Sequence, residues 1–275
     1  MSQAIRNPKS AISNVSTYWE RTHWPLQSLY FLLPLILLYE LGVVMFAGEY
    51  DITARRLLRT GFEWFGVTGY YLPGLLVMVF LLCSHFMRRD PWEPEPKLWV
   101  VMWLESLALT VPLFVFTLVL FREPVAQMMA AAGPAMETGA LTAKDGVLVI
   151  PDWTTGVVFS IGAGIYEELL FRLIAIALLH LLLVDLLSLP EHIGATLAVL
   201  CSAVAFALYH FPEPNPWYWS DFWAGFDLGR FVFYTAAGIY LAMVYVLRGF
   251  GIVAATHALY DVFVVTALFM QSETV

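Results

Sequence analysis

The chain has 275 residues, of which 60% are hydrophobic and 13% are charged, and its mean hydropathy is +0.73. Soluble domains carry about 25% charged residues, so the composition excludes an ordinary soluble protein and indicates a polytopic membrane protein. The net charge of −8 lacks the basic footprint that nucleic-acid binding requires, so we expect no nucleic-acid partner.

The first hydrophobic segment follows a polar N-terminal region that ends near Gln27. This region is longer than the n-region of a usual signal peptide, and no A-x-A cleavage site follows the apolar run. We therefore interpret residues 1–27 as an extramembrane segment and residues 29–47, which include Glu40, as a retained first helix. Residues 28–275 would then form a single transmembrane domain.

Seven hydrophobic segments are long enough to cross a bilayer, which takes about 20 apolar residues. The fourth is long enough to be one strongly tilted helix or two helices, so we expect seven spans, or eight if it divides. We therefore predict an all-α, polytopic transmembrane helix bundle that contacts the lipid bilayer. The segments are 29–47, 67–87, 98–121, 155–184, 194–211, 228–247 and 251–270.

The segments between the spans differ in character. The sequence ITARRLLRTGFEWFG interleaves three arginines with apolar side chains, a pattern typical of a short interfacial helix. The Pro-rich stretch 88–97 is predicted to be an extramembrane loop. The long loop 122–154 is predicted to carry a short strand or hairpin, or to act as a lid. The segment 211–223 has the aromatic residues of an interface belt.

Three charged residues interrupt the fourth span, in the run GIYEELLFRLIAIALL. One charge at the centre of a membrane helix costs about 2.5–3.5 kcal/mol, so these side chains are expected to be paired or used in chemistry. The i,i+4 spacing lets Glu168 pair with Arg172, whereas Glu167 points about 100° away on the helix. We interpret Glu167 as a general base. For the other two, a buried ion pair that only fixes helix packing is an equally good interpretation.

Small residues precede the two glutamates at four-residue spacing, namely Gly156, Ser160 and Gly164. Such a stripe lets another helix approach closely. We expect it to be a packing face that brings the histidine-bearing helices near Glu167.

Two later spans each carry a histidine. His210 ends its span just before Pro212, where a lone histidine is often simply solvated. His257 and Asp261 are one helical turn apart, so Asp261 could orient the imidazole ring, or both could bind one metal ion. We interpret Phe206, one turn before His210, as core packing.

The order EExxxR, FxxxH and HxxxD resembles the CPBP family, which comprises the type II CAAX prenyl endopeptidases and the bacterial Abi-like proteins. The motifs read EELLFR (167–172), FALYH (206–210) and HALYD (257–261). Each is weak alone, but their order and their placement in hydrophobic segments make a specific combination. The resemblance locates the catalytic core in about residues 155–270.

The resemblance implies a glutamate-dependent intramembrane endopeptidase, often described as metal-dependent. Glu167 would activate a water, and His210 and His257 would hold that water or a divalent metal such as Zn, with Asp261 and Glu167 as further candidate ligands. Glu168 and Arg172 would position Glu167. Prenyl-protease members have asparagine at position 261. An ionised aspartate cannot donate a hydrogen bond to an oxyanion, so metal ligation or histidine orientation is favoured for Asp261.

The expected substrate is a membrane-anchored peptide or protein that loses a tail or a leader, and the motifs do not require it to be prenylated. The C-terminal QSETV is no eukaryotic retention signal, so we expect the protein to lie in the bacterial inner membrane.

One alternative function is that of a non-proteolytic binding or scaffold protein that retains the polar cluster for structure. A weaker alternative is a proton-coupled transporter, although the sequence has no internal repeat. The sequence does not indicate an oligomeric state.

Overall fold

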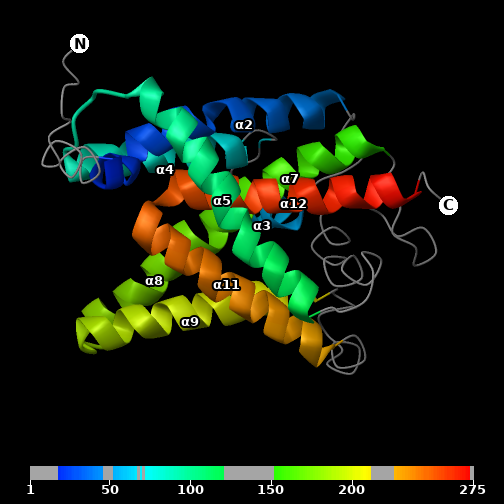
Figure 1. Ribbon diagram of the computed structural model, residues 1–275. Helices are drawn as coiled ribbons and strands as arrows, with labels where there is room; N and C mark the ends of the chain where they lie inside the picture. Colours follow the sequence, from blue (N-terminus) through cyan, green and yellow to red (C-terminus); the bar gives the residue numbers. More distant parts are fainter. Residues whose placement is uncertain are drawn as a thin grey trace, which may run out of the picture.

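The computed structural model describes residues 18–45, 52–66, 69, 72–120, 152–211 and 226–272, and all regular structure within these ranges is helical (Figure 1). Six helices are long and apolar enough to cross a membrane, and a seventh apolar helix has 17 residues. The predicted all-α polytopic bundle is therefore confirmed, and the chain is an integral membrane protein. The helices are α2 (Pro25–Met45), α3 (Thr53–Trp64), α4 (Leu72–Arg88), α5 (Pro96–Leu120), α7 (Trp153–Glu168), α8 (Ile176–His180), α9 (Glu191–Tyr209), α11 (Leu228–Arg248) and α12 (Phe250–Ser272).

The long fourth span is one continuous helical rod from Trp153 to Leu186 rather than two helices. Asp152 begins it, because its carboxylate accepts a hydrogen bond of 2.8 Å from the Thr155 backbone N–H, and this bond lowers the pKa of Asp152. The rod widens into π-helix twice, at η1 (Leu169–Ala175) and η2 (Leu181–Leu186). Single π-helical turns are frequent at functional sites, and η1 begins directly after the two glutamates.

The predicted interfacial helix is α3, and it is amphipathic. One of its arginines is not on the exposed polar face, where it was expected, but points into the protein. Arg55 is fully buried and lies 3.4 Å from a carboxylate oxygen of Glu40 in α2. The ion pair explains why a charged side chain turns inward here, since an unpaired buried charge is costly.

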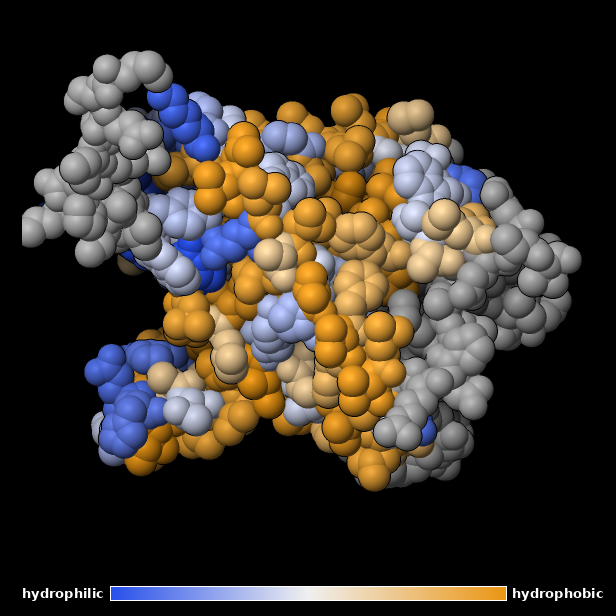
Figure 2. Space-filling view, viewed as in Figure 1, coloured by the Kyte–Doolittle hydropathy of each residue, from blue (hydrophilic) through white to orange (hydrophobic). Residues whose placement is uncertain are grey.

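Helix α12 lies in the middle of the bundle, where it packs along α7 and also contacts α2, α5 and α11. Helices α9 and α11 pack together on one side of it (Figure 1). Apolar side chains cover much of the visible face, and hydrophilic ones gather near its ends (Figure 2). This distribution is the one expected of a protein surrounded by lipid.

The loops are only partly described. Residues 89–95 contain no helix or strand, as predicted for the Pro-rich segment. The strand, hairpin or lid predicted for 122–154 and the aromatic belt predicted for 211–223 fall almost wholly on residues 121–151 and 212–225, outside the described residues.

Candidate active site

The site forms where α12 crosses α7 without a side chain between the two backbones. A Cβ atom added to Gly164 would lie 2.4 Å from the Ala258 backbone nitrogen and 2.7 Å from the Ala254 carbonyl oxygen. Only glycine permits this approach. The predicted packing role of the small-residue stripe is therefore confirmed at Gly164, and the contact brings His257 beside the two glutamates that follow on α7.

Glu168 is held by two partners. Its Oε1 lies 2.7 Å from His257 Nδ1, and its Oε2 lies 3.0 Å from Arg172 Nε in the predicted i,i+4 ion pair, which is confirmed. Arg172 also donates a hydrogen bond of 3.3 Å to the Gly238 carbonyl and lies over the Phe206 ring at 4.5 Å. All these groups are buried, so Glu168 is held in one position, in which it orients the His257 ring.

The two histidines are oriented in the same way. His210 Nδ1 lies 2.7 Å from the Phe206 carbonyl oxygen, which can only accept, so Nδ1 carries the proton. His257 Nδ1 likewise faces the Glu168 carboxylate. In the neutral rings both Nε2 atoms therefore present lone pairs. Both can bind a metal ion or accept a proton from water.

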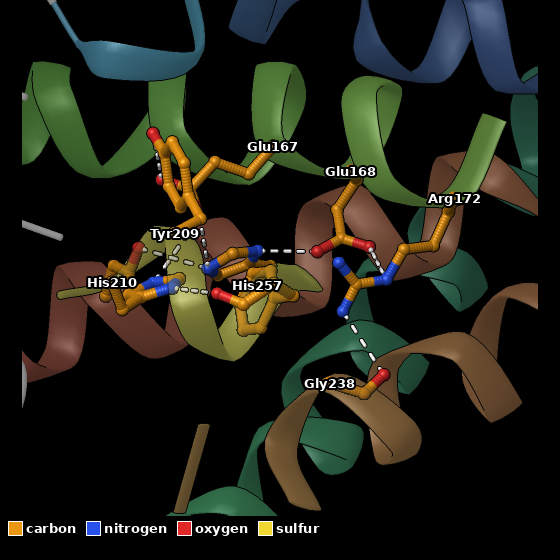
Figure 3. A network of polar contacts seen from close by, with 9 residues as sticks. Glu167, Glu168, Arg172, Tyr209, His210, Gly238 and His257 are labelled. Carbon is orange, nitrogen blue, oxygen red and sulfur yellow. Dashed lines mark hydrogen bonds and ion pairs between the residues drawn. The ribbon is translucent and has the colours of Figure 1, made fainter. Parts of the chain in front are cut away.

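Glu167 faces these two lone pairs. Its Oε2 lies 3.7 Å from His210 Nε2 and 3.9 Å from His257 Nε2, and it accepts no hydrogen bond from the described part of the chain. Its Oε1 accepts a long hydrogen bond of 3.4 Å from the Tyr209 hydroxyl. Figure 3 shows Glu167 turned toward Tyr209 and His210, whereas Glu168 lies between His257 and Arg172. The adjacent glutamates thus have different surroundings.

Asp261 lies at the edge of this cluster. Its Oδ2 is 3.5 Å from His257 Nε2, and 24% of its side chain is exposed, against 7% for His257. The ring nitrogen that an orienting partner would bind, Nδ1, already has Glu168. The geometry therefore assigns ring orientation to Glu168 and leaves Asp261 facing the same nitrogen as Glu167.

Sequence reasoning missed three tyrosines around the glutamates. Tyr209 bonds to Glu167, as described above. Tyr234 of α11 stacks on His210 with ring centroids 4.1 Å apart. Tyr166 donates a hydrogen bond of 2.6 Å to Glu40, which ties α2 to the residue before Glu167. No spacing rule connects these residues, because each contact joins different helices.

The donor set has the chemistry that a divalent metal requires, since imidazole nitrogens and carboxylate oxygens are the usual ligands of Zn. The separations of 3.5–3.9 Å among Glu167, His210, His257 and Asp261 are somewhat longer than the distances between ligands of one tetrahedral ion. Among the described residues, no three histidine, cysteine or acidic side chains are arranged as a complete metal centre. The four groups suit a metal chemically but would have to move closer together to bind it.

Comparison with known proteins gives one family. The model of the family described as Type II CAAX prenyl endopeptidase Rce1-like matches residues 149–263. This stretch contains all six residues that the sequence predicted for the site. No curated protein and no solved structure matches the chain.

Proposed function

We propose that the chain is an intramembrane endopeptidase of the Rce1-like type II CAAX prenyl endopeptidase kind, whose family model matches residues 149–263, and that it uses a water activated by Glu167. The observation that supports this mechanism best is the environment of Glu167 Oε2. This oxygen is buried, has no hydrogen-bond donor among the described residues, and faces two imidazole lone pairs.

A water molecule fits the chemistry of this arrangement. Two atoms 3.7–3.9 Å apart can both lie within about 2.8 Å of one water oxygen. Glu167 takes a proton from that water, and the oxygen attacks the carbonyl carbon of the substrate. Glu167 then gives the proton to the leaving amide nitrogen as the C–N bond breaks, which is the usual sequence for a general base that becomes a general acid.

The neighbours of Glu167 hold the reacting groups in place. Glu168 fixes the His257 ring through Nδ1, and Arg172 holds the Glu168 carboxylate in place through the ion pair. The Phe206 carbonyl fixes the His210 ring. Such supporting contacts matter because a small displacement of a catalytic group costs much of the rate.

A divalent metal is compatible with this proposal. We propose that His210 and His257, with Asp261 and Glu167, would hold it. When bound, such an ion polarises the substrate carbonyl and makes a bound water more acidic. Metal analysis of the purified protein, compared with a His210→Ala, His257→Ala double variant, tests this directly, since equal metal contents in the two would contradict it.

The proposed substrate is a membrane-anchored peptide or protein, because the site lies within the membrane-spanning helices. The test compares peptide termini in membranes of cells that carry the wild type, Glu167→Gln or the matched control Glu63→Gln at equal expression. We expect specific termini to vanish only with Glu167→Gln. Termini that are unchanged in all three strains, while a deletion still has a phenotype, would favour a non-proteolytic scaffold.

A further inference from the structure

Tyr234 combines burial, contact with a site residue and an unused hydrogen-bond donor. Its side chain is 4% exposed, and its ring lies almost parallel to the His210 ring, with an interplanar angle of 24° and centroids 4.1 Å apart. Its hydroxyl has no hydrogen-bond partner in the described part of the chain. Buried tyrosine hydroxyls usually find a partner, so this one needs an explanation.

Other tyrosines beside the site have partners. The Tyr166 hydroxyl donates to Glu40 at 2.6 Å, and the Tyr209 hydroxyl donates to Glu167 at 3.4 Å. The Tyr260 hydroxyl pairs with Thr117 at 2.9 Å. Tyr234 differs from these three in that its O–H has no partner among the described residues.

Tyr234 is connected to the reacting groups through the ring on which it stacks. The ring against which it packs, His210, is one of the two whose Nε2 faces Glu167. Tyr234 therefore lies beside a histidine of the proposed site, and its O–H has no partner among the described residues.

Peptide hydrolysis in this site lacks an obvious donor for the developing negative charge. Glu167 and Asp261 are acceptors when ionised, and the His210 and His257 Nε2 atoms present lone pairs when both rings are neutral. Arg172 is already used by Glu168 and by the Gly238 carbonyl. A tetrahedral oxyanion gains most from a donor that is already in place and shielded from water.

We propose that the Tyr234 hydroxyl donates a hydrogen bond to the oxyanion of the tetrahedral intermediate. The proposal rests on the endopeptidase function proposed above. Water attack places negative charge on the former carbonyl oxygen, and the Tyr234 O–H donates to that oxygen without transferring its proton. The bond is released when the carbonyl re-forms and the amine leaves.

The test uses the full-length protein in lipid nanodiscs and the substrate identified by the comparison of termini. Tyr234→Phe keeps the ring that stacks on His210 and removes only the hydroxyl. We expect kcat to fall about 10²- to 10³-fold, as on loss of one oxyanion-hole donor, with KM nearly unchanged. The matched control is Tyr240→Phe on the same helix, whose hydroxyl donates to the Leu109 carbonyl, and it should keep wild-type kcat.

Two further measurements separate this role from a structural one. Removing a buried hydroxyl that has no partner should leave the melting temperature unchanged or raised. A phosphinic peptide analogue of the cleaved bond mimics the tetrahedral state, so Tyr234→Phe should weaken its inhibition by a factor close to the loss in kcat. Wild-type kcat in Tyr234→Phe would overturn the inference. A Tyr234→Phe variant that loses activity and also has a lower melting temperature would overturn it too, because the loss would then come from reduced stability.

The same assay distinguishes the two proposals. If the wild type cleaves, Glu167→Gln does not, and Tyr234→Phe matches the wild type, only the role of Tyr234 is wrong. If Glu167→Gln cleaves as fast as the wild type, the proposed function is wrong, and the oxyanion role of Tyr234 is wrong with it.

Discussion

Two carboxylates inside the helix bundle, Glu105 and Glu167, differ in what surrounds them. Glu105 of α5 binds Arg248 through both of its oxygens, with Arg248 Nη2 at 2.8 Å, and it also accepts a hydrogen bond from Tyr18. Glu167 has one long hydrogen bond, from Tyr209, and one oxygen without a donor among the described residues. One carboxylate is fully satisfied and the other is not.

The comparison shows how the same side chain can serve structure or chemistry. A guanidinium that binds both oxygens keeps a carboxylate ionised and fixed. Arg248 is held in turn by the Trp19 ring at 3.7 Å. Burial and the bond to Glu105 raise the pKa of Tyr18. Glu105 therefore joins three parts of the chain, whereas Glu167 has one oxygen that no described residue binds.

The largest effect should follow from Glu167→Gln. The amide has nearly the same shape but cannot take a proton, so we expect the rate of peptide cleavage to fall about 10²- to 10⁴-fold, with the melting temperature nearly unchanged. Initial rates and thermal unfolding of the purified protein measure both. More than roughly a tenth of the wild-type rate would contradict the role of Glu167 as the base.

The next largest effect concerns the ion pair behind Glu167. Arg172→Met removes the buried partner of Glu168, whose side chain is 0% exposed, and leaves an uncompensated buried charge. We expect a loss of about 3–5 kcal/mol in the free energy of unfolding, measured by denaturant titration in detergent. A stability equal to that of the wild type would mean that Glu168 does not need Arg172 to remain in place.

Glu105→Gln makes the same chemical change as Glu167→Gln at the satisfied carboxylate. It should lower the free energy of unfolding by about 1.5–3 kcal/mol, because charged hydrogen bonds are lost, and leave kcat unchanged. The two variants together test the difference between the carboxylates. Glu167→Gln should change activity alone, and Glu105→Gln should change stability alone. A loss of kcat in Glu105→Gln with unchanged stability would contradict the structural role of Glu105.

The smallest effect is expected on the surface. Arg59 and Glu63 of α3 form an i,i+4 pair at 3.8 Å, and their side chains are 33% and 49% exposed. Glu63→Gln should change the free energy of unfolding by no more than about 0.5 kcal/mol, which makes it the control for the three buried changes. A larger shift, detected by the same titration, would show that α3 depends on this pair.

Within the site, two predictions that were made from residue spacing along one helix are confirmed. Glu168 and Arg172 are one turn apart, so their pairing follows from helix geometry. The stripe that ends at Gly164 predicted a close helix contact, and α12 makes that contact. The missed residues, Tyr209 and Tyr234, are adjacent to Glu167 or His210 only through contacts between helices.

The sequence by itself determined the helices, because a run of apolar residues long enough to cross a bilayer can satisfy its backbone hydrogen bonds only as a helix. It also determined which charged residues those helices contain. The tertiary structure alone decided that Arg55 turns inward to Glu40 and that Glu168, rather than Asp261, orients His257. It also decided that Tyr234 lies on His210. Such contacts depend on the rotation and crossing of separate helices, which the periodicity of one segment does not specify.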